Sequence, residues 1–208
     1  MTEASGPTRV LICRHGPTNW NRTGRVQGHC DVPLSDQGRQ LIREWQLPTD
    51  LPISAWWSSP LIRAIETANR LGAKNLQTDD RLIEGDWGDW DGQRLADIRT
   101  AIPDVMERLE AKGLDFLPPN GESPRMVRDR LASFLADIAA TGGTVAVFCH
   151  KGVIRALYSL AVNWDMTHDP PDKLRDACCH LFDLNQHGHP SITELNIPLG
   201  HAAKKQAW

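Results

Sequence analysis

Short apolar runs alternate with amphipathic stretches along the chain. The runs at residues 9–13 and 144–149 are continuous and of strand length, so they predict strands buried on both faces. Residues 53–57 form a weaker third run, and residues 181–184 and 191–195 are two later candidates. The pattern therefore predicts short strands that are distributed over the whole chain.

Serine-proline pairs mark the starts of two predicted helices. A serine N-cap accepts a hydrogen bond from the first helical turn, and proline is well tolerated at the first helical position. Ser59-Pro60 therefore predicts a helix over residues 60–71. Ser123-Pro124 predicts another, in which apolar residues recur at helical spacing until Gly142-Gly143 ends it.

Two further helices complete the predicted order of elements. Ser35 begins a helix that ends near residue 45, and another is expected over residues 152–161. Strands that alternate with helices predict an α/β fold with a mainly parallel sheet. Ligands of such sheets bind beyond the carboxyl ends of the strands. The residues that follow Cys13, Trp57 and Cys149 are therefore the place to look for chemistry.

The composition is that of an ordinary globular protein. Of the 208 residues, 40% are hydrophobic and 24% are charged, which argues against disorder, and the length fits one domain over residues 1–208. No apolar run approaches the roughly 18 residues of a membrane span, and the start lacks the pattern of a secretory signal. The net charge of −3 argues against a nucleic-acid partner, which would favour a basic surplus.

The chain ends and the cysteines add further expectations. We expect a core over about residues 8–198 and a short, frayed tail over residues 201–208. Five cysteines, mostly in apolar runs, indicate reduced thiols in a cytoplasmic protein. Cys178-Cys179-His180 does not predict a metal site, because adjacent cysteines have poor geometry for a shared tetrahedral ion.

Histidines and arginines follow three of the predicted strands. Arg14 and His15 come directly after the first strand, Arg63 follows the second, and His150 follows the strand at residues 144–149. An arginine fork donates two hydrogen bonds to a phosphoryl group and stays charged. A neutral histidine can attack phosphorus and carry the phosphoryl group covalently. These four residues therefore predict a phosphoryl pocket that needs no metal.

Such a pocket also needs a proton donor for the leaving oxygen. Glu84 is the best candidate, since partial desolvation by the nearby Trp87 and Trp90 would raise the pKa of its carboxyl group. The two tryptophans are interpreted equally as core residues and as pocket wall. The sequence leaves three rival carboxylates in the same segment: Asp86, Asp89 and Asp91.

Five motifs occur in order over residues 9–155. They are Arg14-His15-Gly16-x-Thr18-x-x-Asn21, Ser58-Ser59-Pro60 with Arg63, Glu84 with Gly88-x-Trp90-x-Gly92, Gly121-Glu122-Ser123, and His150-x-Gly152-x-x-Arg155. This set resembles the motifs of the histidine phosphatase superfamily, which includes cofactor-dependent phosphoglycerate mutases and many small-molecule phosphatases. The resemblance implies the phosphoglycerate mutase-like fold, a three-layer α/β/α sandwich.

The resemblance also implies a role for each matched residue. His15 would be the nucleophile that becomes phosphorylated, and Glu84 would be the general acid and then the base that activates water. The phosphoryl oxygens would be held by Arg14, Arg63 and His150, with further pocket residues at Asn21, Thr18, Gln27 and Gly28. The resemblance implies no metal and no cofactor, and a small phosphorylated metabolite as the partner.

Hydrolysis of small phosphate monoesters through a phosphohistidine at His15 is the activity we expect. The family's mutases carry a longer, Arg-rich and Pro-rich insertion after the acid motif, whereas residues 93–120 hold three arginines. A cofactor-dependent phosphoglycerate mutase is therefore the second choice. A third alternative is a non-catalytic protein that binds a phosphorylated ligand on the same fold. The physiological substrate and the oligomeric state stay open, with a homodimer as one option.

Two positions depart from the family pattern. Pro17 stands where members commonly have Glu or Gln, so a polar side chain near the nucleophile is missing. Lys151 stands where glycine is common. Its side chain would either add positive charge at the pocket rim, which suits a more anionic substrate, or face water.

Overall fold

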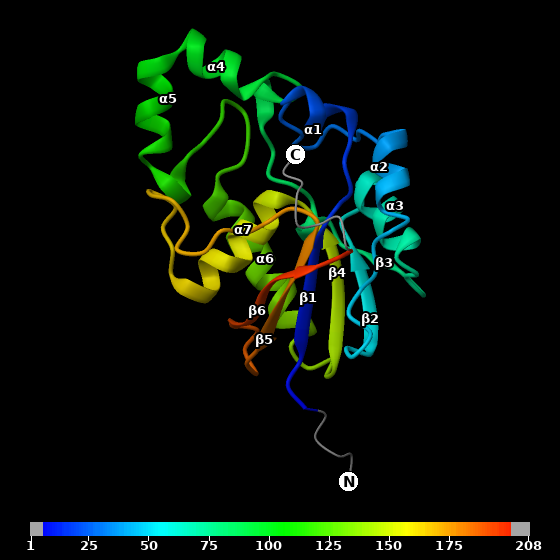
Figure 1. The fold of residues 1–208 in the computed structure, drawn as a ribbon. Helices are drawn as coiled ribbons and strands as arrows, with labels where there is room; N and C mark the ends of the chain where they lie inside the picture. Colours follow the sequence, from blue (N-terminus) through cyan, green and yellow to red (C-terminus); the bar gives the residue numbers. More distant parts are fainter. Residues whose placement is uncertain (1–5, 201–208) are drawn as a thin grey trace.

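The computed structural model describes residues 6–200 of the chain, in which six strands form one mixed sheet (Figure 1). The strand order is β3-β2-β4-β1-β5-β6. Four strands are parallel: β1 (Arg9–Arg14), β2 (Ile53–Ser58), β3 (Gln77–Thr78) and β4 (Thr144–Cys149). Two pair in antiparallel fashion at one side: β5 (Cys178–Leu184) and β6 (Pro190–Pro198). The predicted α/β fold with a mainly parallel sheet is confirmed.

Helices cover both faces of this sheet (Figure 1). One face carries α6 (Pro124–Ile138) and α7 (Lys151–Val162), and the other carries α2 (Asp36–Leu41) and α3 (Ile62–Arg70). Alternate residues of a strand point to opposite faces of a sheet. Val10 and Ile12 accordingly join the buried cluster with α6 and α7, whereas Leu11 and Cys13 join the cluster on the other face. The three-layer arrangement follows from this double burial.

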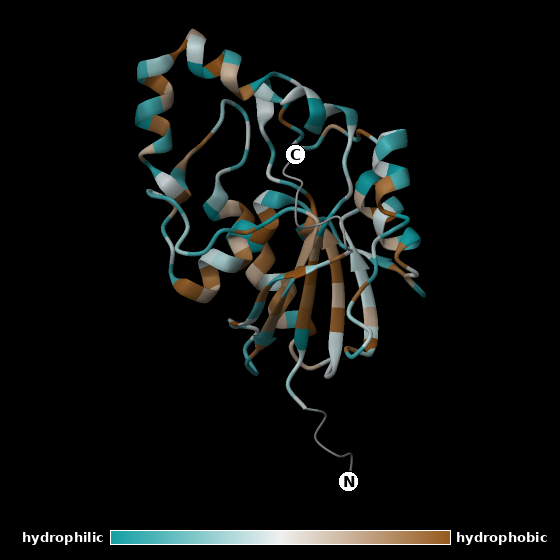
Figure 2. Ribbon diagram, viewed as in Figure 1, coloured by the Kyte–Doolittle hydropathy of each residue, from teal (hydrophilic) through white to brown (hydrophobic). Residues whose placement is uncertain are grey.

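The remaining helices lie beyond the carboxyl edge of the sheet. They are α1 (Asn19–Thr23), α4 (Leu95–Ala101) and α5 (Pro103–Glu110), and three 3₁₀ turns span Asp80–Leu82, Gly88–Trp90 and Gly113–Asp115. Figure 1 shows α4 and α5 extending away from the sheet, and Figure 2 shows that they alternate apolar and polar residues, whereas apolar residues dominate the central strands. A small cluster around Trp90, Ile98 and Met106 packs this segment.

Two predicted helix boundaries are wrong. The helix expected over residues 60–71 begins at Ile62, and Leu61 is its N-cap without a side-chain hydrogen bond. Ser59 instead turns its hydroxyl towards His150. The helix from Ser35 ends at Leu41, because i to i+3 hydrogen bonds continue the chain as tight turns to Trp45. By contrast, Ser123 caps α6 as predicted, with its Oγ accepting a hydrogen bond from Met126 N.

Several other expectations from the sequence can be compared with the structure. All five cysteines, which lie within residues 6–200, are free thiols. Within the same residues, no helix has the length and apolar character needed to cross a lipid bilayer. The tail over residues 201–208 lies outside the described residues.

Candidate active site

The two predicted histidines meet at the carboxyl edge of the sheet. His15 follows β1 and His150 follows β4, and these strands are direct neighbours. Their ring centroids lie 5.2 Å apart. His15 is 3% exposed and His150 is fully buried. The backbone N–H of His15 also donates to Cys149 O at 3.0 Å, which extends the sheet register into the site.

The hydrogen bond of His15 defines which of its ring nitrogens is free. Nδ1 lies 2.7 Å from the backbone oxygen of Gly16. Because a carbonyl oxygen only accepts, Nδ1 carries the proton, and Nε2 keeps its lone pair in the neutral ring. Burial lowers the pKa of His15 well below its ordinary value, and the charges of Arg14 and Arg63 lower it further. The arrangement therefore provides an unprotonated nitrogen nucleophile at neutral pH.

His150 is held by a neighbouring strand end. Its Nε2 is hydrogen-bonded to Ser59 Oγ at 2.8 Å, whereas its buried Nδ1 has no partner among residues 6–200. Burial lowers the pKa of His150 well below its ordinary value, and Arg63 and His15 add to this effect. The site thus contains two neutral histidines that are surrounded by arginine charge.

Arg63 is fully buried and bonds to the loop around residues 27–30. Its Nη1 donates to Cys30 O at 2.8 Å and its Nη2 to Gly28 O at 3.0 Å. Its Nε is buried and has no partner within the described residues. Burial lowers the pKa of this guanidinium, which still places a positive charge beside both histidines. Arg63 therefore supports the wall of the site with the hydrogen bonds that it makes here.

Arg14 and Lys151 share one carboxylate. Arg14 Nη1 donates to Asp176, and Lys151 Nζ lies 3.8 Å from the other oxygen of the same carboxylate. Asp176 is almost buried and lies just before β5, 162 residues from Arg14. Burial lowers the pKa of Lys151, whereas Asp176 opposes that shift. Asp176 is thus an ion-pair partner that these two cations share at the end of β1.

Glu84 is oriented by backbone donors. Its Oε1 accepts from Gly85 N at 2.9 Å and its Oε2 from Gly152 N at 3.1 Å. Its carbonyl oxygen accepts from Arg130 Nη2, and Arg130 is also ion-paired with Glu122 at 2.8 Å. A Cβ on residue 152 would lie 2.3 Å from Glu84 Oε1, so the glycine at the start of α7 is what allows this approach.

The four predicted pocket residues divide into two groups. Asn21 and Gln27 line the cavity described below, whereas Thr18 and Gly28 lie behind them. Thr18 Oγ1 donates to Gln27 Oε1 at 2.7 Å and accepts from Asn21 N, which caps α1. Gly28 N donates to Asp91 Oδ1, and a Cβ there would lie 2.7 Å from Trp87 N. Thr18 and Gly28 therefore position the wall that the other two form.

The three rival carboxylates, Asp86, Asp89 and Asp91, accept hydrogen bonds from loop residues. Asp91 accepts from the backbone of Gly28 and Cys30, and Asp89 accepts from Asn120 Nδ2. Asp86 accepts from Gly88 N but also lines the cavity. Glu84 and Asp86 are therefore the two carboxylates of this segment that face the cavity.

The two tryptophans also divide between core and wall. Trp90 is 7% exposed in the cluster beneath α4 and α5, whereas Trp87 is half-buried and lines the cavity. Both rings contact Phe116, with centroid separations of 5.8 Å for Trp87 and 6.1 Å for Trp90. Trp90 is thus a core residue, and Trp87 is part of the pocket wall.

A cavity of about 660 Å³ joins these groups. Its reacting end is formed by Arg14, His15, Glu84 and Gly152, and neither Arg63 nor His150 lines it within residues 6–200. Sequence reasoning gave no lining role to several residues that the irregular segments supply: Arg25, Leu95, Arg99, Phe116, Arg155, Met166 and Asp169. Of these, Arg155 carried a signal by itself because it closes the last motif, and the others except Arg25 fall in residues 85–125 and the segment after Asn163, which the sequence indicated only as regions that set specificity.

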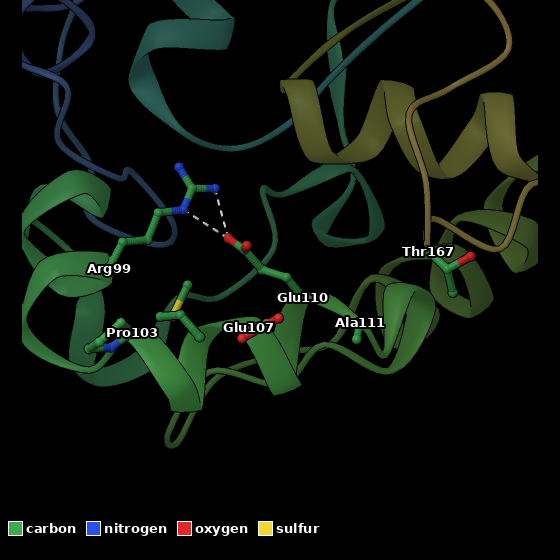
Figure 3. Close-up of a pocket in the computed structure, with 7 residues that line it drawn as sticks. Arg99, Pro103, Glu107, Glu110, Ala111 and Thr167 are labelled. Carbon is green, nitrogen blue, oxygen red and sulfur yellow. Dashed lines mark hydrogen bonds and ion pairs between the residues drawn. The ribbon is translucent and has the colours of Figure 1, made fainter.

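A smaller groove of about 400 Å³ runs along α5. Arg99 and Glu110, ion-paired at 2.7 Å, line both the groove and the large cavity (Figure 3). This pair therefore lies between the two hollows, and its charges neutralise each other.

The fold and the site define an α/β protein with a neutral histidine, arginines and a carboxylate at the carboxyl edge of its sheet. Residues 10–198 match the family model of the Histidine phosphatase superfamily (branch 1). The chain belongs to this superfamily, which confirms the resemblance of the motifs.

Known relatives carry phosphatase and mutase-like names. The chain is 35% identical over 161 residues to phosphoglycerate mutase-like protein 4 of Arabidopsis thaliana, over 73% of this chain and 70% of the relative. It is 31% identical over 169 residues to phosphoserine phosphatase 1 of Hydrogenobacter thermophilus, over 76% of this chain and 78% of the relative. A mycobacterial glucosyl-3-phosphoglycerate phosphatase in complex with VO3 superposes with a TM-score of 0.76 at 26% identity, over 91% of this chain and 98% of that one.

Proposed function

We propose that the protein is a metal-independent phosphatase that hydrolyses small phosphate monoesters through a phosphohistidine at His15. One observation carries the proposal: the Nδ1 hydrogen bond to Gly16 O leaves Nε2 of a buried, neutral ring free beside the cavity. A neutral histidine with a free ring nitrogen can attack phosphorus and carry the phosphoryl group covalently.

The reaction has two steps. In the first, His15 Nε2 forms a bond to phosphorus while the ester P–O bond breaks, and Glu84 gives its proton to the leaving oxygen. In the second, Glu84 takes a proton from water, the oxygen of that water attacks phosphorus, and the N–P bond breaks. Inorganic phosphate leaves, and His15 and Glu84 return to their starting states.

The charge on the transferring group is balanced by fixed cations. Arg14 and Lys151 line the reacting end, and Arg63 stands buried behind it. Among residues 6–200, His150 behind this end keeps one ring nitrogen without a partner. Cations that are held in place before the reaction lower the barrier because they need no rearrangement as charge develops.

The phosphatases among the relatives favour hydrolysis of the phosphohistidine over transfer of the phosphoryl group back to the substrate. A phosphoserine phosphatase and a glucosyl-3-phosphoglycerate phosphatase are among the proteins that this chain resembles. A phosphoglycerate mutase is the second candidate, favoured by the mutase-like Arabidopsis relative. The non-catalytic alternative is disfavoured because His15, Glu84 and His150 are all present at one site.

The proposal is tested by phosphate release from an aryl phosphate and a panel of small phosphate monoesters, with EDTA present. We expect EDTA-resistant release from several members of the panel. The same enzyme is assayed on 3-phosphoglycerate with a bisphosphate primer. Isomerisation with little release would make it a mutase, and saturable binding without turnover would make it a ligand-binding protein.

The pH dependence follows from the lowered histidine pKa. Protonation of Nε2 removes the nucleophile, and because the pKa of His15 is depressed, that proton is taken up only below the ordinary value of about 6.5. We therefore expect the acid limb of kcat/KM to lie below pH 6.5. Substrates whose phosphate groups differ in pKa separate the ionisation of the enzyme from that of the substrate. An acid limb that stays at or above 6.5 for all of them would contradict the assignment.

A further inference from the structure

One nearly buried carboxylate stands behind the reacting end of the cavity. Arg14 Nη1 donates to Asp176 Oδ1, and Lys151 Nζ lies 3.8 Å from Asp176 Oδ2. The side chain of Asp176 is 8% exposed and that of Arg14 is 12% exposed. Both cations line the cavity, whereas Asp176 is not among its lining residues within residues 6–200. The carboxylate is therefore placed to act on a bound phosphoryl group through the two cations rather than by contact.

The backbone on both sides of Asp176 is fixed by the strand β6. Arg175 N donates to Asn196 Oδ1 at 2.7 Å, and Asn196 Nδ2 donates to Lys173 O at 2.9 Å. On the other side, the first backbone N–H after β6 donates to Ala177 O at 3.0 Å. Ala177 has a φ of 54°, a left-handed conformation that persists where the surrounding structure holds it. Asp176 is thus a counter-ion whose position is determined by the sheet.

Arg14 gains from such a fixed partner because its side chain is long and ends at the cavity. Ordering an arginine side chain costs conformational entropy, and the nearby charge of Lys151 repels the guanidinium. The charge-assisted hydrogen bond to Asp176 orders the guanidinium before a substrate binds. A cation that is ordered in advance stabilises charge in the transition state without rearrangement.

We propose that Asp176 is a positioning residue for the phosphatase reaction, which holds the Arg14 guanidinium in the orientation that stabilises the transferring phosphoryl group. Its charge also offsets part of the positive charge of Arg14 and Lys151. Asp176 therefore favours the transition state without tightening the binding of phosphate in the ground state. The inference rests on the proposed function and adds a residue that does not contact the substrate.

Asp176→Asn keeps the size of the side chain and one acceptor oxygen but removes the charge. We expect kcat to fall by about tenfold, because a neutral hydrogen bond orders Arg14 less strongly than a charge-assisted one. An alkyl and an aryl phosphate should lose equally, since both carry the same phosphoryl group. KM should stay within about threefold or fall, because the site gains one net positive charge. An unchanged kcat, or a loss that lies entirely in KM, would overturn the proposal.

A double-mutant cycle tests whether the effect passes through Arg14. In the Arg14→Met background, adding Asp176→Asn should change kcat by less than about twofold, because the group that Asp176 positions is gone. Thermal unfolding of each variant shows that the assayed enzyme is folded. If Asp176→Asn does not fold, the cycle is run with Asp176→Glu, which keeps the charge and displaces it by one methylene. A loss that persists undiminished without Arg14 would mean that the carboxylate supports the fold instead.

Asp172→Asn is the matched control. Asp172 lies in the same segment before β5, and its Oδ2 accepts a hydrogen bond from Tyr158 Oη at 2.9 Å. The change removes one carboxylate charge from this segment at a place that lies outside the cavity lining within the described residues. We expect kcat within about twofold of the wild-type value. A loss as large as that of Asp176→Asn would count against a specific role of the contact with Arg14.

Orthovanadate and orthophosphate separate this inference from the proposed function. Vanadate can adopt the five-coordinate geometry of phosphoryl transfer, and calorimetry measures the Kd of both anions. We expect Asp176→Asn to weaken vanadate relative to phosphate by about tenfold. If no ester is turned over, the phosphatase proposal fails, whereas an Asp176-dependent preference for vanadate still supports the positioning of Arg14. If turnover is normal and neither kcat nor this preference depends on Asp176, the phosphatase stands and the inference fails.

Discussion

Replacing His15 with alanine should lower the rate of phosphate release by at least about 10³-fold, because it removes the nitrogen proposed to form the covalent intermediate. His15 lines the cavity, and its Nδ1 is engaged by Gly16 O, which leaves Nε2 for the proposed attack. Steady-state release from an aryl phosphate and from an alkyl phosphate measures the loss. Brief exposure of the wild-type enzyme to ³²P-labelled substrate should leave a label that is lost in acid and kept in alkali, as expected for a phosphohistidine.

The matched control for this variant is His180→Asn. His180 is also buried, at 1% exposure, and burial lowers its pKa to about 4. Its Nδ1 accepts a hydrogen bond from Asn196 N on β6, outside the cavity. We expect His180→Asn to keep its labelling and most of its activity. Release that persists in His15→Ala, or label that remains on that variant, would contradict the assignment of the nucleophile.

The parts of the site that adjoin regular elements could be predicted from the sequence. Arg14 ends β1, His15 and His150 directly follow β1 and β4, and parallel strands bring their carboxyl ends to one edge. Gly152 could be predicted as part of a motif. Why a glycine is needed there is visible only in the structure, where a Cβ would collide with Glu84. Local spacing thus determines which residues reach the edge of the sheet, and tertiary packing determines what they contact there.

Other parts of the site depend on contacts between distant segments. The Arg14–Asp176 pair spans 162 positions, and the run of residues before β5 gives no periodic signal for it. The resemblance implies that Arg63 holds phosphoryl oxygens, and the structure adds that its two Nη atoms donate to the backbone carbonyls of Cys30 and Gly28. Ser59 has the sequence of a helix cap and binds His150 instead. In each case the partner comes from a distant part of the chain.

Replacing Glu84 with glutamine should affect substrates according to their leaving groups. An alkyl phosphate needs a proton on its leaving oxygen, so its kcat/KM should fall by about 10²–10⁴-fold. An activated aryl phosphate leaves without that proton, so its kcat/KM should fall by less than about tenfold. Because Glu84 also activates water in the second step, the aryl substrate should give a burst of alcohol and a phosphoenzyme that accumulates. Equal losses for both substrates would point to another donor, with Asp86 as the remaining carboxylate of the segment that faces the cavity.

Gly152→Ala should give the same dependence on the leaving group without changing the chemistry of Glu84. The new Cβ would lie 2.3 Å from Oε1, so the side chain of Glu84 must move while its carboxyl group is still present to give and take a proton. Alanine favours a helix over glycine by about 1 kcal/mol, so a weaker α7 cannot be the cause of a loss. We expect kcat/KM for an alkyl phosphate to fall several times more than kcat/KM for an aryl phosphate in both Glu84→Gln and Gly152→Ala. This result would show that the position of the carboxylate, as well as its presence, controls proton transfer. Equal effects on the two substrates in Gly152→Ala would mean instead that the displaced carboxylate disturbs phosphate binding.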